Sequence, residues 1–308
     1  KKKKKNNNNN NNNSGRRFDS RRSDEPMVIR PLRDEHRESG PVEGGRRYQM
    51  PRGTQQDQPA SNDGRPGRTM RAPRFRRNNF NEDEVLKLLE SRHNQRGITF
   101  DNYESIAVEI VPNDIDAVTS FVGLGIEPAL EENIRRCGYQ KPTPVQKYGI
   151  PVCLAGRDLM ACAQTGSGKT AAFLIPVIQH ILVHGVSPAE RRRSLPIALV
   201  MAPTRELALQ IYDESRKLVL RTDVYCDVVY GGIPYPTFFE QDILVACPGR
   251  LKDIFDRESI SFSRTKFLIL DEADRMLEMG FEEQIEYLVH SSFTDMPPPE
   301  ERQTLMFS

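Results

Sequence analysis

The residues with the clearest chemistry form a glycine-rich loop, Ala163-Gln164-Thr165-Gly166-Ser167-Gly168-Lys169-Thr170. An apolar segment precedes this loop and a helical pattern follows it. Glycines allow backbone N–H groups to turn inward around phosphate oxygens, and the N-terminal end of the following helix attracts the same negative charge. In such a loop Lys169 reaches the β and γ phosphates of a nucleotide, and the Thr170 hydroxyl lies near Mg²⁺. The strict pattern opens with glycine where this chain has Ala163, but the flanking elements favour nucleotide binding over a chance match.

A short acidic segment, Asp271-Glu272-Ala273-Asp274, directly follows an apolar stretch at residues 266–270. Magnesium beside a phosphate loop needs a carboxylate at the carboxyl end of a neighbouring parallel strand, and we expect Asp271 to supply it through water. Glu272 is predicted to orient and deprotonate the attacking water, which makes Glu272, Asp271 and Lys169 the candidate catalytic residues. An ordinary acidic first turn of a helix is the alternative interpretation. The glycine loop upstream favours the catalytic one.

The elements that must position these residues alternate along the chain. Short apolar segments predict strands at residues 158–163, 197–202, 224–230, 243–246 and 267–270. Helical patterns occupy residues 126–138, 207–220 and 281–289. Apolar strands that alternate with helices predict a doubly wound α/β fold, with a parallel sheet and helices on both faces.

The charge of the chain is unevenly distributed. The net charge of the 308 residues is +1, but residues 1–80 contain 21 Lys and Arg against 9 Asp and Glu. This segment is rich in Arg, Gly and Asn and poor in apolar residues, which predicts a disordered basic tail, with order beginning near Phe80. Such a tail can contact single-stranded RNA or serve as an inert linker. Residues 81–120 are interpreted as an N-terminal extension, with a short helix at 82–90 and an extended stretch at 98–110.

The five cysteines form no CxxC pair and none has the spacing to histidine that zinc sites require. This pattern argues against a zinc framework and a disulfide framework and fits a reducing compartment. No apolar run reaches the length of a transmembrane helix, so no membrane association is expected.

A segment of nine residues upstream of the glycine loop resembles the Q motif of DEAD-box RNA helicases. It reads Gly138-Tyr139-Gln140-Lys141-Pro142-Thr143-Pro144-Val145-Gln146. Phe121 matches the isolated aromatic residue that this family has upstream of the motif. The resemblance implies a RecA-like fold for residues 121–308 and ATP as the nucleotide. In the family the glutamine reads adenine and the aromatic ring packs on the base. The implied ATP-binding residues are therefore Phe121, Tyr139, Lys141 and Gln146, together with the eight residues of the glycine loop.

Further motifs follow in the order of the family. Three of them resemble its sequence-independent RNA-backbone contacts: Pro203-Thr204-Arg205, Gly231-Gly232 and Pro248-Gly249-Arg250. Asp274 and Ser308 correspond to residues that couple the two helicase domains, and residues 303–308 resemble the extended lead into the Ser-Ala-Thr motif. The segments 97–103 and 274–281 favour the Vasa-like branch.

The resemblance implies an ATP-dependent RNA helicase that requires ATP and Mg²⁺ and binds RNA and ribonucleoprotein partners. It implies a cytoplasmic location, with ribonucleoprotein granules and the nucleus as further options. We expect the second helicase domain to be absent from these 308 residues, so that the chain alone binds nucleotide and hydrolyses it slowly. An ATP-gated RNA clamp without productive unwinding is the alternative. Two departures from the family, a shortened segment after Gly232 and Cys247 in place of threonine, favour that alternative.

Overall fold

The computed structural model describes residues 26–31, 81–94, 108–112, 114–185, 193–234, 241–290 and 292–308. Within these residues the chain forms an eight-stranded sheet of order β2-β1-β3-β8-β7-β4-β6-β5. The strands are β1 (Met27–Pro31), β2 (Val108–Val111), β3 (Leu159–Ala161), β4 (Ala198–Met201), β5 (Cys226–Val229), β6 (Ile243–Ala246), β7 (Phe267–Asp271) and β8 (Gln303–Phe307). All neighbouring strands run parallel except β1 and β2, which are antiparallel. The predicted α/β fold with a largely parallel sheet is confirmed.

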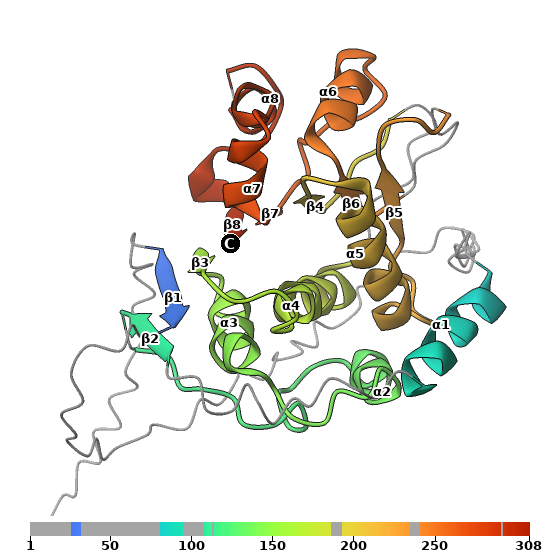
Figure 1. Ribbon diagram of the computed structural model, residues 1–308, viewed down its shortest axis with the longest axis vertical. Coiled ribbons are helices and arrows are strands. Elements are labelled where there is room, and N and C mark those ends of the chain that lie inside the picture. Colours follow the sequence, from blue (N-terminus) through green and yellow to red (C-terminus); the bar gives the residue numbers. More distant parts are fainter. Residues whose placement is uncertain are drawn as a thin grey trace, which may run out of the picture.

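Eight α-helices surround the strands in the described part of the chain (Figure 1). They are α1 (Glu82–Asn94), α2 (Pro128–Arg136), α3 (Pro144–Leu154), α4 (Lys169–His184), α5 (Arg205–Leu218), α6 (Pro248–Asp256), α7 (Ala273–Glu278) and α8 (Glu282–Val289), followed by the short 3₁₀ helix η2 (Pro299–Glu301). None of these helices combines the length and the apolar character needed to cross a membrane.

The central strands bury both of their faces, each in a different core. Ala198 and Val200 of β4 point into a core shared with α2, α3, α4 and α5. Leu199 and Met201 of the same strand point into a core shared with α6, α7 and α8. Because side chains alternate between the faces of a strand, a continuous apolar run indicates a strand covered on both sides. The helices α2 to α5 and the helices α6 to α8 accordingly lie on opposite sides of the strands (Figure 1).

The first strand in the chain, β1, corrects one prediction. Order was expected to begin near Phe80, whereas Met27–Pro31 forms β1 between β2 and β3. Met27 and Ile29 are buried in the core that the strands share with α2 to α5, called the first core below, and the Cys162 N–H donates to the Ile29 carbonyl at 2.7 Å. The other residues of the segment 1–80 lie outside the described ranges, so the prediction of a disordered tail is not tested there. The extended stretch expected at 98–110 is described only from Val108 onward, as β2.

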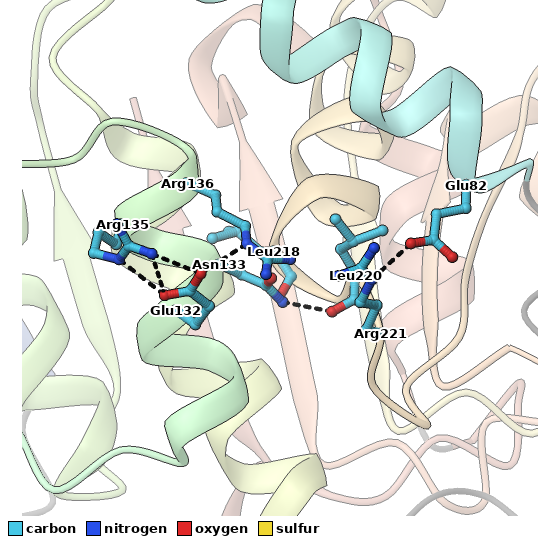
Figure 2. Close-up of polar contacts among 8 residues, drawn as sticks. All are labelled: Glu82, Glu132, Asn133, Arg135, Arg136, Leu218, Leu220 and Arg221. Carbon is cyan, nitrogen blue, oxygen red and sulfur yellow. Dashed lines mark hydrogen bonds and ion pairs between the residues drawn. The ribbon is translucent and has the colours of Figure 1, made fainter.

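The N-terminal extension packs against α5 through its helix α1. This helix is four residues longer than predicted, and its Val85 and Leu89 side chains are buried in the first core. At its start Glu82 pairs with Arg221 at 2.6 Å, beyond the end of α5 (Figure 2). On the other side of α5, the buried Asn133 amide of α2 donates to the carbonyls of Leu218 and Leu220 (Figure 2). These bonds satisfy backbone carbonyls that a helix end leaves without an intrahelical partner.

Candidate nucleotide-binding site

The glycine loop connects the end of β3 to the start of α4, as the sequence predicts. Gly166 and Gly168 have φ angles of 80° and 91°, in the left-handed region that favours glycine. A Cβ atom on Gly168 would stand 2.4 Å from the side-chain nitrogen of Gln146. Glycine is therefore required at position 168 for backbone conformation and for space.

Ala163, the departure from the strict pattern, acts through its main chain. Its N–H donates to the Ser308 carbonyl at 2.9 Å, and its own carbonyl accepts a hydrogen bond from Lys169 Nζ at 2.9 Å. It is not among the residues with positive φ, so its methyl group causes no backbone strain. Alanine can therefore replace glycine at this position.

The acidic segment begins at the carboxyl end of β7, and its first carboxyl group lies close enough to the glycine loop to feel the charge of Lys169. Asp271 is only 2% exposed. Burial raises the pKa of the Asp271 carboxyl to about 6, and the charge of Lys169 opposes that rise. Ionised Asp271 would be stabilised by a cation, since burial in a low dielectric penalises an unpaired charge.

Glu272 is held in an unusual backbone conformation at the start of α7. Its φ and ψ angles are 53° and 51°, in the left-handed region that L-residues seldom adopt. Its N–H donates to Asp271 Oδ1 at 3.1 Å, and its carboxylate pairs with Arg275 Nη1 at 3.2 Å. A strained backbone of this kind, kept in place by its surroundings, often marks a functional position.

The predicted coupling residues Asp274 and Ser308 are brought together. Ser308 hydrogen-bonds to the Asp274 carboxyl and holds the pKa of that group below its usual value. The Ser308 N–H also donates to the Ala161 carbonyl at 3.0 Å, at the end of β3. Residue 308 therefore contacts both the acidic segment and the strand that leads into the glycine loop.

The Q-motif residues lie beside the same loop. Gln146 is buried, its Oε1 accepts from the Thr143 N–H at 3.0 Å, and its Nε2 donates to the Gly168 carbonyl at 3.0 Å. The Phe121 ring is buried against Tyr139, with ring centroids 6.0 Å apart. Lys141 is exposed in the loop before α3. The structure thus joins Gln146 to the glycine loop, and it places Phe121 and Tyr139 together as one aromatic pair.

The three predicted RNA-contacting motifs follow the ends of β4, β5 and β6, which are neighbours in the sheet. Thr204 caps α5 by accepting the Leu207 N–H at 3.2 Å. The Arg205 guanidinium lies 6.0 Å from the centre of the Tyr230 ring, and a Cβ atom on Gly232 would stand 3.1 Å from one of its nitrogens. The Arg205 side chain, from the motif that follows β4, therefore lies beside Tyr230 and Gly232 at the end of β5.

The third motif, Pro248-Gly249-Arg250, forms the first turn of α6 and contacts the segment that follows Gly232. Arg250 donates to the Ile233 carbonyl and pairs with Asp253 at 3.3 Å. Pro248 is the first residue of the helix, and the space around the Cα hydrogens of Gly249 is open, as it also is at Gly231. Cys247 occupies the N-cap position without a side-chain cap, and burial raises the pKa of its thiol to about 11. The shortened segment predicted after Gly232 falls mostly on residues 235–240, outside the described ranges.

Two charged residues near the site were not predicted from the sequence. Glu214 and Lys217 of α5 are buried and form an ion pair, and Glu214 also accepts a hydrogen bond from the Tyr139 hydroxyl. The sequence does contain a signal for Glu214. It lies three residues after Ile211 and four before Leu218, on the apolar stripe of the helix, where a charge is unexpected.

No group of three or more His, Cys, Asp or Glu side chains within the described ranges could hold a metal ion by itself. All five cysteines are free thiols, four of them buried. A magnesium ion at Asp271 would accordingly need oxygen ligands from a nucleotide or from water, as is usual for magnesium bound with phosphates.

Residues 143–308 match the family model described as DEAD/DEAH box helicase. Among solved structures the chain is similar to the RNA helicase Prp28 from Chaetomium thermophilum bound to ADP, with 36% identity and a TM-score of 0.54, over 62% of this chain and 45% of that chain. It is also similar to a DEAD box protein from the hyperthermophile Methanococcus jannaschii, with 32% identity and a TM-score of 0.54, over 62% of this chain and 50% of that chain. The chain therefore spans about half the length of these two proteins. With the glycine loop, the acidic segment and the Q motif assembled on a RecA-like sheet, and with a family model that matches more than half of the sequence, this chain belongs to the DEAD/DEAH box helicase family.

Proposed function

We propose that this chain is the ATP-binding part of an ATP-dependent RNA helicase, in which RNA-stimulated hydrolysis of ATP separates short RNA duplexes locally. The observation that carries the proposal is the connection through residue 308. Ser308 bonds to Ala163 of the glycine loop and to Asp274 of the acidic segment, and Lys169 lies within electrostatic reach of Asp271. This arrangement supports one triphosphate site shared by the two motifs.

The nucleotide would be held by the glycine loop and the Q motif. Lys169 would exchange the Ala163 carbonyl for phosphate oxygens, and the backbone N–H groups of residues 164–170 would donate to the same phosphates. An amide oxygen can accept two hydrogen bonds and an amide nitrogen can donate two. Gln146 can therefore bind the donor and acceptor edge of adenine while it keeps its bonds to Thr143 and Gly168.

The donor set fits magnesium. Asp271 offers a buried carboxylate whose ionised form needs a compensating charge, and Thr170 offers a hydroxyl at the start of α4. Bound there, the ion would neutralise charge on the β and γ phosphates. Asp271 and Thr170 are the residues that we assign to hold it, with water between the ion and the protein.

Glu272 is assigned as the residue that orients the attacking water and accepts its proton. Its backbone is fixed by the bond to Asp271 and its carboxylate by Arg275, so the side chain has a defined position relative to the magnesium residue. Asp274 and Ser308 are assigned to coupling with a second helicase domain. An arginine supplied by such a domain accelerates phosphoryl transfer by about 10³–10⁵. Hydrolysis by the 308 residues alone should therefore be slow.

RNA would bind across the ends of β4, β5 and β6. Arg205, the Thr204 hydroxyl and the N-terminal end of α6 are suited to phosphates and 2′-hydroxyl groups, and they read no base sequence. The basic segment 1–80 is proposed to add electrostatic contacts to single-stranded RNA. The sequence segments 97–103 and 274–281 support the Vasa-like branch, and with it a cytoplasmic location and ribonucleoprotein partners.

The Lys169→Ala variant tests the nucleotide site. We expect ADP binding, measured by calorimetry, to be lost while the melting temperature is retained, because Lys169 stands at the first position of α4 and outside the core. Lys87→Ala, which removes an exposed lysine of α1, is the matched control and should bind as the wild type does. Wild-type affinity in Lys169→Ala would remove the assignment of the loop.

An ATP-gated RNA clamp is the second candidate, favoured by one observation. Cys247 leaves the N-cap of α6 without the hydroxyl that would cap the helix and contact a phosphate. Duplex separation by a protein that contains both helicase domains distinguishes the two functions. A helicase releases the strand with ATP, whereas a clamp holds RNA in an ATP-dependent manner without separating the duplex.

A further inference from the structure

A buried ion pair on helix α5 contacts Tyr139 of the Q motif. Glu214 and Lys217 are only 3% and 4% exposed, and their side chains pair one helical turn apart. The Glu214 carboxylate also accepts a hydrogen bond from the hydroxyl of Tyr139, which belongs to the loop between α2 and α3. The three side chains thus connect α5 to the loop that begins the Q motif.

Stability alone does not account for this pair. Burying two charges requires the removal of their water, and apolar side chains of similar volume often stabilise a core equally well or better. Elsewhere α5 follows that rule, since Ala208, Ile211 and Leu218 face the first core. The carboxylate at position 214 provides what an apolar residue cannot, namely an acceptor for the Tyr139 hydroxyl.

The Tyr139 contact bears on the position of the whole loop. The Tyr139 ring packs against Phe121, and the same loop continues to Thr143, the N-cap of α3, with Gln146 in the first turn of that helix. Gln146 in turn donates to the carbonyl of Gly168 in the glycine loop. A hydroxyl fixed by Glu214 therefore fixes one end of the segment whose other end contacts the phosphate site.

We propose that Glu214, held in place by Lys217, is a positioning residue for the adenine base: through Tyr139 it preorganises the aromatic pair and the Q-motif loop. This inference rests on the proposed nucleotide site. A loop that spends only part of its time in the binding conformation lowers the apparent affinity by that fraction. The effect should be larger for adenine nucleotides than for guanine nucleotides, because only adenine matches the hydrogen-bonding groups that Gln146 offers.

The first test is the Tyr139→Phe variant of the full chain, which keeps the ring against Phe121 and removes the hydroxyl. We expect the affinity for ADP to fall about three- to tenfold, the range that one net hydrogen bond produces, and the affinity for GDP to fall less, so that the preference for ADP decreases. Both constants are measured by calorimetry with Mg²⁺. Asp213→Asn is the matched control, because it removes the neighbouring carboxylate of α5, whose partner is Arg216 at 2.5 Å. This control should keep the wild-type preference for ADP.

Two double variants separate positioning from a purely structural role. Glu214→Gln with Lys217→Met removes both charges and keeps an acceptor for Tyr139, so the preference for ADP over GDP should be retained. Glu214→Leu with Lys217→Met is equally uncharged and lacks the acceptor, so the preference should fall as it does in Tyr139→Phe. The melting temperature of each double variant is measured first, and the comparison is made at a temperature at which both are folded. Equal preference in the two variants, whether kept or lost, would overturn the inference.

The wild-type chain distinguishes this inference from the proposed function. If wild-type protein binds ADP no better than GDP, or binds neither, the adenine site itself is wrong. If it prefers ADP and Tyr139→Phe prefers ADP to the same degree, the nucleotide site stands and only the positioning role of Glu214 fails.

Discussion

The strand β1 leads to a prediction about stability that the tail-like composition of residues 1–80 would not suggest. Ile29 lies in register with Ala161 of β3 on one side and with Ile110 of β2 on the other. Its side chain is 2% exposed and belongs to the first core. Ile29→Ala should therefore leave a cavity inside the domain, although position 29 lies far from the motifs in sequence.

The expected loss follows from this burial. Replacing a buried isoleucine with alanine costs about 2–5 kcal/mol in unfolding free energy. In a domain of this size each kcal/mol lowers the melting temperature by about 2–4 °C, so a fall of about 4–20 °C is expected. If β1 detaches as a unit, the loss cannot exceed the free energy that holds the strand. The double variant with Met27→Ala should then lose less than the sum of the two single variants.

Thermal denaturation followed by circular dichroism measures this effect. Val28→Ala is the matched control, because Val28 is only half-buried and alternates to the opposite face of the strand, so its loss should be smaller. A chain that begins at residue 32 should melt at or below the temperature of Ile29→Ala. Unchanged melting temperatures in Ile29→Ala and in the shortened chain would mean that β1 does not belong to the sheet.

Three further changes have defined outcomes. In a protein with both helicase domains, Glu272→Gln should bind ATP normally and lower turnover by about 10²–10⁴-fold, measured as phosphate release; undiminished turnover would exclude Glu272 as the base. Cys247→Thr should supply the missing N-cap hydroxyl of α6 and add about 0.5–2 kcal/mol to the free energy of unfolding in urea, whereas Cys247→Val, which has the same shape without the hydroxyl, should not. Burial and the neighbouring His184 lower the pKa of His180 to about 4, below the value of 6.5 expected in the unfolded chain. The unfolded state therefore takes up the proton first as pH falls, and stability is lost between about pH 6.5 and pH 4. His180→Gln should lose less stability over that window, and identical pH profiles of the melting temperature would contradict this.

The sheet was largely predictable where strands are continuous apolar runs. Residues 243–246 form β6 as predicted, and the strands β4 and β7 lie within one residue of their predicted ends. Such runs need no partner to be recognised, because both of their faces are buried. The extended stretch expected at 303–308 is confirmed as β8.

β1 could not be predicted in the same way. It has five residues, charged residues lie close to it on both sides (Asp24-Glu25 and Arg33-Asp34), and Pro31 ends it. Its pairing partner Ala161 is 132 residues away from Ile29. A strand this short is stabilised by its pairing with β2 and β3, and the local composition carries no information about that pairing.

The candidate site shows the same division between local and distant information. The glycines of residues 163–170 are a local requirement of the loop, so the sequence predicts them directly. The buried carboxylate of Glu214 in α5 accepts a hydrogen bond from Tyr139, which lies 75 residues earlier in the loop between α2 and α3. Only the position of Glu214 on an apolar stripe indicated that such a partner exists.

The order of the strands explains why one serine connects the two halves of the site. β8 lies between β3, which leads into the glycine loop, and β7, which ends at the acidic segment. The carboxyl ends of these parallel strands meet at one edge of the sheet, so the residue that follows β8 must lie between the two motifs. Ser308 is that residue, and it bonds to Ala163 through its main chain and to Asp274 through its side chain. A displacement of residue 308 would therefore disturb the glycine loop and the acidic segment together, whereas a displacement within one motif would break only the bond of that motif to Ser308.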